Sequence, residues 1–251
     1  MKMVLLTALG VGGATLFGSI LGFVFRKISH KFSDIVLSVA AGVMLCAAVT
    51  GLIMPSLEYE GPAPLLVTIA GVLSGAVFLN LLDKLVPHLH RLAGTEQEAH
   101  PESSARLNKV LLFVMAIAIH NLPEGIAAGG GFGSGDNAQA FTIAAGIALQ
   151  NIPEGMVIIG PMLAAGMSPG KTFLCAAATG VVEVVGTLLG YFAVSISAAI
   201  LPFALAFAGG TMLYVISDEM IPETHHSETR GVTYAMLIGF CIMLAMDFFL
   251  G

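Results

Sequence analysis

Apolar segments long enough to cross a lipid bilayer recur along the whole 251-residue chain. A membrane-spanning helix needs about 20 mainly apolar residues. Hydrophobic residues make up 57% of the chain and charged residues 10%, whereas charged residues make up about 25% of an ordinary soluble domain. We therefore predict an all-α, polytopic membrane protein. Its eight transmembrane helices are expected near residues 3–25, 33–55, 64–86, 108–130, 139–163, 171–195, 202–221 and 231–250.

The distribution of positive charge predicts how these spans are oriented. Nine of the ten Lys and Arg residues lie in or beside the connections that follow the odd-numbered spans, and only Lys2 lies on the other side. Because cytoplasmic loops carry the excess of Lys and Arg, both termini are expected to face outward. The apolar segments recur too regularly to leave an interdomain linker. We predict one transmembrane domain over residues 1–251, with a polar cytoplasmic loop at 87–107.

The net charge excludes one class of partner. The formal net charge is −6, so the chain has no basic surface of the kind that binds nucleic acid. The expected surroundings are the lipid bilayer.

One short polar sequence occurs twice inside the apolar segments, thirty positions apart. The first copy is HNLPEG over residues 120–125, and the second is QNIPEG over residues 150–155. On a helix, residues three and four apart lie on the same face. Within each copy, the first two polar side chains therefore share a face with the glutamate.

The proline in each copy should kink its helix, because proline lacks an N–H and crowds the carbonyl group four residues earlier. Those carbonyls belong to Ile119 and Leu149. Two such helices facing each other would gather nitrogen and oxygen ligands around one place. The doubled motif therefore indicates a metal site.

A third buried carboxylate, Glu183, lies in the next apolar segment. An ionised side chain at the centre of a bilayer costs roughly 2.5–3.5 kcal/mol or more, so each of these carboxylates needs a partner, and a shared divalent cation would supply one. The predicted metal-site residues are His120, Asn121, Glu124, Gln150, Asn151, Glu154 and Glu183.

The donor atoms of this set restrict the metal. Imidazole, carboxylate and amide ligands without a thiolate suit Zn²⁺, Fe²⁺, Mn²⁺ or Cd²⁺ better than Cu⁺. Weak amide ligands also suit a site that must release its ion. We expect the ion to be a transported substrate and the chain not to be an enzyme.

Further polar residues lie near the ends of the predicted spans. Glu58 at the outer mouth could attract cations, and His88 and His90 in the cytoplasmic loop could receive them, although solvated loop histidines are an alternative. Asp218 and Glu219, near the cytoplasmic end of the seventh span, could form an exit site or simply a hydrated helix end.

Two other functions remain open at this point. An intramembrane metallohydrolase would also place His and Glu on buried helices, but such enzymes usually carry H-E-x-x-H. A transporter of organic cations or protons could use the carboxylates as counter-ions. Proteolysis of a membrane substrate would indicate the first, and the absence of stoichiometric metal binding would indicate the second.

The paired HNLPEG and QNIPEG sequences in consecutive spans resemble the ZIP (Zrt/Irt-like) family of divalent metal transporters. Gln150 in place of a histidine, together with Glu183, is similar to the GufA-like prokaryotic branch. The resemblance implies import of zinc, or of Cd²⁺, Fe²⁺ or Mn²⁺, into the cytoplasm. It also implies a 3+2+3 arrangement of spans with inverted repeats, homodimers, and location in a bacterial inner membrane. An elevator-like motion of spans 1, 4, 5 and 6 against the other spans is a further implication.

The resemblance also implies a division of the ligands between two metal positions. Glu124 and Glu154 would bridge both, and Asn151 stands where family members often have Asp. The first position would use His120, Glu124, Gln150, Glu154 and Glu183, and the second Asn121, Glu124, Asn151 and Glu154. Met44 matches a methionine near the first position, and Asp218 and Glu219 match peripheral metal-binding positions.

Overall fold

The computed structural model describes residues 1–251 except 26–29, 60, 93–114, 116–117, 120, 133–136, 165, 197, 225–229 and 251. Its described secondary structure is helical. The α-helices are α1 (Lys2–Val24), α2 (His30–Cys46), α3 (Met54–Glu58), α4 (Pro64–Leu92), α6 (Asn137–Ala164), α7 (Pro169–Ile196), α8 (Leu201–Val215), α9 (Ile221–Thr224) and α10 (Gly231–Leu250). The first motif copy lies on a further helix, described over residues 121–132.

Seven helical stretches in the described part of the chain are long and apolar enough to cross a membrane. They are Lys2–Val24, Lys31–Glu58, Pro64–Leu81, Ala140–Gly160, Pro169–Ser195, Leu201–Met220 and Gly231–Phe249. They confirm seven of the eight predicted spans. The remaining one, 108–130, is described at residues 115, 118–119 and 121–130, and all of these are helical.

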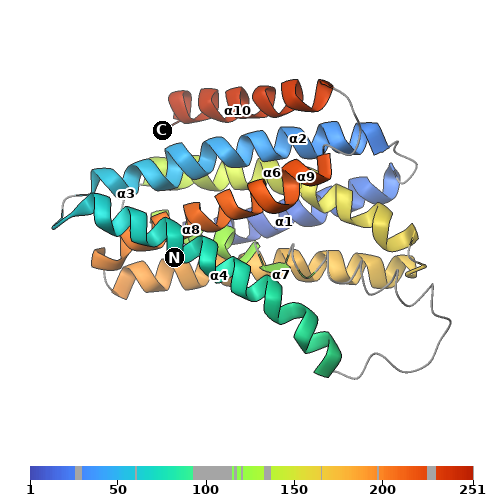
Figure 1. Ribbon diagram of the computed structural model, residues 1–251, viewed down its shortest axis with the longest axis horizontal. Helices are drawn as coiled ribbons and strands as arrows, with labels where there is room; N and C mark the ends of the chain where they lie inside the picture. The colour runs from blue at the N-terminus through green and yellow to red at the C-terminus, as the bar shows by residue number, and fades with distance from the viewer. Residues whose placement is uncertain are drawn as a thin grey trace.

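The long helices run back and forth along one axis of the molecule (Figure 1). The two ends of the chain lie toward the same end of this axis (Figure 1). The helix α4 extends further than the sequence predicted, because residues 87–92, assigned to a loop, are helical. The leucines at 82, 85, 89 and 92 recur every three or four residues, which continues one apolar face past the end of the predicted span.

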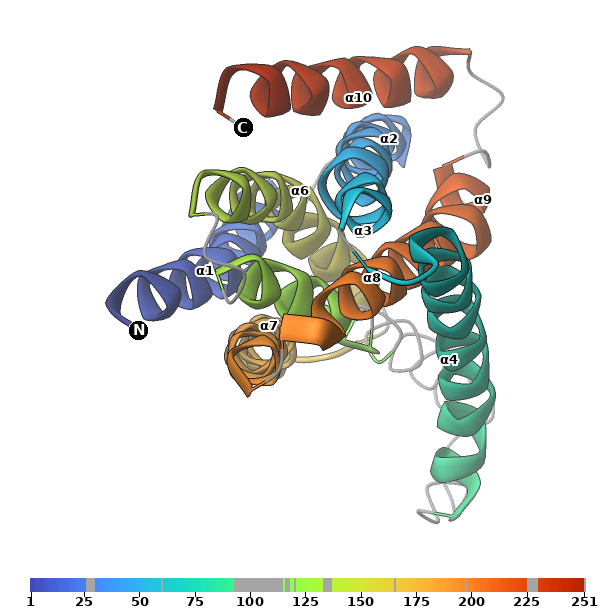
Figure 2. The same cartoon turned by 90° about the vertical axis from the view of Figure 1, so that its left-hand side faces the viewer.

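The helices form two groups by their contacts, and Figure 2 shows the molecule from one end of its long axis. In one group α1 packs along α6 and α7, and helix 121–132 packs on α7. In the other group α2 pairs with α10, and α4 pairs with α8.

This pairing has the symmetry expected of the predicted repeats. If spans 1, 2 and 3 correspond to spans 6, 7 and 8, the pairing of α2 with α10 corresponds to that of α8 with α4. The same correspondence exchanges α1 with α7, so the pairing of these two helices is unchanged by it. The observed contacts therefore agree with a 3+2+3 arrangement.

The two corresponding spans α2 and α8 share a feature that the sequence reading missed. Each continues into a π-helical segment, η1 (Ala47–Ile53) after α2 and η3 (Ile216–Met220) after α8. A short α-helix with proline at its second position follows each segment, with Pro55 in α3 and Pro222 in α9. Because proline cannot donate the next helical hydrogen bond, both segments lie where the regular α-helical ladder is interrupted.

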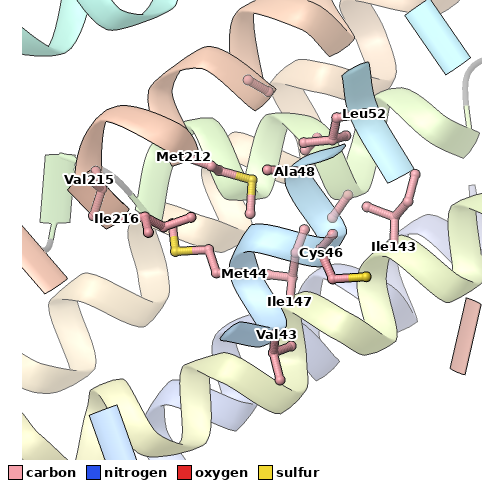
Figure 3. Close-up of a cluster of buried hydrophobic side chains, with 14 of the residues drawn as sticks. Val43, Met44, Cys46, Ala48, Leu52, Ile143, Ile147, Met212, Val215 and Ile216 are labelled. Carbon is pink, nitrogen blue, oxygen red and sulfur yellow. The ribbon is translucent and has the colours of Figure 1, made fainter. Parts of the chain in front are cut away.

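The two groups meet through small and flexible apolar side chains. Figure 3 shows this cluster, in which residues of α2 and η1 pack against α6 and α8. Met44 of α2 and Met212 of α8 are fully buried there, together with Ile143 and Ile147 of α6. Methionine adapts to irregular surroundings, so the contact between the groups is apolar and deformable.

Candidate metal-binding site

The motif side chains are buried inside the group formed by α1, helix 121–132, α6 and α7. Asn121 and Glu124 lie on helix 121–132, and Gln150, Asn151 and Glu154 lie on α6. Four of these five have no solvent-exposed area, and Glu154 is 6% exposed. Both helices remain α-helical on either side of their prolines. Each proline lacks the N–H of one helical hydrogen bond, and the described residues on both sides of it are helical.

Glu183 of α7 connects the two motif copies. Its Oε1 accepts hydrogen bonds from Asn121 Nδ2 at 2.5 Å and from Thr15 Oγ1 at 2.6 Å. Its Oε2 accepts one from Asn151 Nδ2 at 2.7 Å. One fully buried carboxylate therefore joins helix 121–132, α6 and α1 to α7.

A second hydrogen bond joins the motif copies directly. Gln150 Nε2 donates to Glu124 Oε1 at 2.6 Å. This bond fixes the orientation of the Gln150 amide, because a carboxylate can only accept and the nitrogen must face it. The two helices are thereby held with their polar faces together.

Several buried oxygens of the motif pair have no hydrogen-bond donor among the residues that the structure describes. They are Asn121 Oδ1, Asn151 Oδ1, Gln150 Oε1 and Glu124 Oε2. Buried polar atoms in proteins are nearly always hydrogen-bonded, and exceptions in a native fold require an explanation such as an ion. All four atoms are hydrogen-bond acceptors. An oxygen whose lone pairs accept no hydrogen bond can coordinate a cation instead.

The carboxylates also act on one another. The carboxyl groups of Glu124, Glu154 and Glu183 lie near enough to one another to repel when they are ionised. Like charges in a low-dielectric interior repel strongly. A divalent cation bound among these oxygens would reduce this repulsion.

No three His, Cys, Asp or Glu side chains form a metal-binding group within the described part of the chain. His120 lies outside the described residues. The Glu183 carboxylate is directed at two amides and a hydroxyl instead. The arrangement therefore depends on amide oxygens as well as carboxylates, and the complete ligand set stays a prediction.

The other residues predicted to contact the ion lie apart from this cluster, or their side chains are not among those that the structure describes. Met44 is buried in the apolar contact between the two helix groups (Figure 3). Glu58 is exposed at the end of α3. In η3, Asp218 is exposed and Glu219 is partly buried. The side chains of His88 and His90, on the last turns of α4, lie outside the described residues, as do His100, His225 and His226.

Sequence reasoning missed Thr15, which donates to Glu183. A signal for it exists in α1, where small and polar residues recur on one helix face at Gly12, Thr15, Ser19 and Gly22. All four are buried. In an otherwise apolar span, such a stripe of small residues indicates a face for close helix contact.

Comparison with known proteins identifies the family. The model of the family described as ZIP Zinc transporter matches residues 88–247. The chain belongs to the ZIP family. This confirms the resemblance of the doubled motif and the expectation of a membrane transporter that is not an enzyme.

Individual ZIP relatives match nearly the whole chain. It is 39% identical to Zinc transporter GufA of Myxococcus xanthus, over 98% of each protein. It is 37% identical to Zinc transporter ZIPB of Bordetella bronchiseptica, over 95% of this chain and 78% of that protein. It is 30% identical to Zinc transporter ZupT of Shigella dysenteriae, over 97% of this chain and 95% of that protein. These relatives agree with the GufA-like prokaryotic branch.

Proposed function

We propose that this ZIP protein carries zinc across the membrane and into the cytoplasm through the site between its two motif copies. The observation that carries the proposal is the set of buried acceptor oxygens from both copies that have no donor among the described residues. Relatives similar over nearly the whole chain are named zinc transporters.

The chemistry is ligand exchange without bond breaking in a substrate. The carboxylate and amide oxygens of the two helices replace water around the ion, with Glu124 Oε2 available for ligation while its Oε1 accepts from Gln150. Glu154 completes the pair, and His120 and Glu183 are the further proposed ligands. Nitrogen and oxygen donors suit Zn²⁺, and Cd²⁺, Fe²⁺ or Mn²⁺ would fit the same donor types.

The proposed direction of transport rests on charge. Nine of ten Lys and Arg residues lie on the side of the connections after odd-numbered spans, which favours termini outside and import into the cytoplasm. We further propose a bacterial inner membrane and a homodimer. Glu58 would attract ions outside, while Asp218, Glu219 and the loop histidines would receive them inside.

Of the other functions considered, family membership disfavours the intramembrane metallohydrolase. A transporter of organic cations or protons would bind no zinc. Titration of the purified protein with zinc separates that function from the proposed one.

The test is zinc influx into proteoliposomes that contain the wild type, Glu124→Gln or Glu154→Gln. Both substitutions keep the side-chain shape and remove a charge that the ion needs, so each should abolish influx in folded protein. Asp247→Asn is the matched control, because Asp247 lies on α10 in the other helix group. It should transport zinc as the wild type does.

Two outcomes would contradict the proposal. Influx that persists in both Glu variants would place the transport path away from the motif pair. A folded wild type that imports Cd²⁺, Fe²⁺ or Mn²⁺ but not Zn²⁺ would keep the site and change the substrate.

A further inference from the structure

Thr15 is a buried residue of α1, a helix that carries no residue of the doubled motif. Its Oγ1 donates a hydrogen bond to Glu183 Oε1 at 2.6 Å, across a sequence separation of 168 residues. Thr15 is 1% exposed, and Glu183 has no exposed area. A hydroxyl in a transmembrane helix can instead donate to the backbone of its own helix, as Ser19 does to the Thr15 carbonyl. The Thr15 hydroxyl therefore makes a contact that helix formation does not require.

The two carboxylate oxygens of Glu183 have different numbers of donors. Oε1 accepts hydrogen bonds from Thr15 Oγ1 and from Asn121 Nδ2. Among the described residues, Oε2 accepts one, from Asn151 Nδ2 at 2.7 Å. Each oxygen of an ionised carboxylate offers about two lone-pair positions. Thr15 and Asn121 therefore occupy both positions on Oε1, whereas Oε2 keeps one that can bind a cation.

Close helix contacts fix the place of Thr15 relative to both neighbouring helices. A β-carbon added at Gly155 of α6 would overlap the Thr15 carbonyl oxygen. One added at Gly12 of α1 would overlap the carbonyl oxygen of Gly180 on α7, three residues before Glu183. Because the backbones touch on both sides, the Thr15 hydroxyl is held at a set distance from the Glu183 carboxylate.

We propose that Thr15 is a positioning residue, which holds Oε1 of Glu183 so that Oε2 faces the ion and binds it. This inference rests on the proposed function, in which Glu183 is a ligand beside Glu124 and Glu154. Hydrogen-bond partners of metal-binding side chains orient those ligands, and their loss commonly lowers metal affinity about 10–100-fold. The helix α1 thus contributes to ion binding although it supplies no ligand.

The first test removes the Thr15 hydroxyl. Thr15→Val keeps the shape of the side chain, so zinc affinity measured by calorimetric titration should fall at least about 10-fold. Thr15→Ser restores the donor and should recover the affinity. Thr211→Val is the matched control and should bind zinc as the wild type does. Thr211 is equally buried, but it donates within its own helix, to the Ala208 carbonyl.

An unchanged affinity in Thr15→Val, or an equal loss in Thr15→Ser, would overturn the proposal. Melting temperatures of the zinc-free variants are measured in parallel. If the melting temperature falls in Thr15→Val while zinc affinity stays at the wild-type value, the bond serves fold stability alone, and the proposal is likewise overturned.

A double-mutant cycle asks whether Thr15 acts through Glu183. A positioning residue has no effect once the group that it positions is gone. Thr15→Val should therefore cause little further loss of zinc affinity in a Glu183→Ala background. If the losses from the two substitutions multiply instead, Thr15 acts on zinc binding by another route and the proposal fails.

Infrared difference spectra with and without saturating zinc give a direct view of the carboxylates. A zinc-induced carboxylate band that is absent from Glu183→Gln belongs to Glu183. That band should shift in Thr15→Val, because Oε1 has lost a donor, and it should stay in place in Thr211→Val. The proposal is overturned if the band does not shift in Thr15→Val, or if Glu183→Gln loses no band.

The same spectra separate this inference from the proposed function. Glu124→Gln and Glu154→Gln should each lose a zinc-induced band. If both variants keep every band, the proposed site itself is wrong. If both lose a band while Thr15→Val leaves the Glu183 band unshifted, the site stands and the positioning role of Thr15 fails.

Discussion

At the scale of single residues, the amide nitrogens of the motif pair donate hydrogen bonds, whereas several of its oxygens have no described donor. Glu124, Gln150, Asn121 and Asn151 each make a hydrogen bond inside the site. Each also keeps one oxygen without a described donor. A structural polar cluster in a membrane protein would be expected to satisfy both kinds of atom. The surplus of acceptors is therefore better explained by a cation than by helix packing.

Asn151→Asp tests the balance of charge around Glu183. The substitution removes the two N–H donors of Asn151 and places a second carboxylate beside Glu183 Oε2. Two buried carboxylates repel unless a cation lies between them. The zinc-free variant should melt at a lower temperature than the wild type, and saturating zinc should raise its melting temperature by more than it raises that of the wild type.

The measurement is thermal unfolding in detergent with and without zinc, with Asp247→Asn as a charge control on the other helix group. An unchanged melting temperature of zinc-free Asn151→Asp would show that the Asn151 amide does not support Glu183.

Several of the polar residues singled out from the sequence hydrogen-bond to one another in the structure, but the sequence could not predict how they are paired. The doubled motif and Glu183 were visible because polar residues are costly in apolar segments. The stripe of small residues that contains Thr15 was also visible, but a threonine can donate to its own helix backbone, so the sequence does not show that Thr15 has a distant partner. Only the packing of α1 against α7 reveals its bond to Glu183.

At the scale of helices, glycine positions decide how closely the site helices approach. The chain has thirty glycines, and many fall in pairs four residues apart, a spacing that allows close helix contact. The structure confirms this for Gly125 and Gly129, which face α7, and for Gly186 and Gly190, which face helix 121–132. The sequence does not distinguish these glycines from those that face open space.

Gly155→Ala and Gly160→Ala form a matched pair on α6. The β-carbon that Gly155→Ala introduces would overlap the backbone of α1, so the two helices must move apart, and unfolding stability should fall by about 1–3 kcal/mol. Gly160 has no atom within 4 Å of an added β-carbon, so Gly160→Ala should be neutral or should stabilise by up to about 1 kcal/mol through helix propensity.

Denaturant unfolding of the two variants checks this difference, and zinc titration accompanies it. Gly155→Ala should also weaken zinc binding, because Thr15 moves with α1. Equal stability of the two variants would mean that α1 and α6 are not held at the distance described.

The helical spans themselves were predictable because their length and hydropathy depend on the bilayer alone. The π-helical segments η1 and η3 were not. The proline that follows each segment was visible in the sequence, but a proline is equally compatible with a kink, a π turn or the start of a new helix. The choice depends on the neighbouring spans.

At the scale of the whole molecule, the helices divide into a group that contains the candidate metal site and a second group that packs against it. Residues of α1, α6, α7 and helix 121–132 are joined by the bonds to Glu183. Their contact with α2, η1 and α8 is apolar and rich in methionine (Figure 3). Hydrogen bonds to Glu183 hold the first group together, whereas the described core of the contact between the groups consists of apolar side chains. This difference fits the elevator-like motion that the family resemblance implied from sequence.

A disulfide between the groups tests that motion. A β-carbon at Gly146 of α6 would lie 3.9 Å from the Ala47 β-carbon of η1, within the usual range for a disulfide of about 3.5–4.5 Å. The added atom would also press on the end of the flexible Met243 side chain, which can move aside. Ala47→Cys with Gly146→Cys, in a background where Cys46, Cys175 and Cys241 are replaced by serine, should therefore crosslink on oxidation.

If the groups must move against each other, zinc influx into proteoliposomes should stop in the oxidised double variant and return after reduction. Each single cysteine variant should transport zinc under both conditions, which controls for damage by the substitutions. Full influx through a protein shown by mass spectrometry to be crosslinked would contradict movement at this contact. Zinc would then have to pass between fixed groups, and the hydrogen bonds around Glu183 would serve a static path.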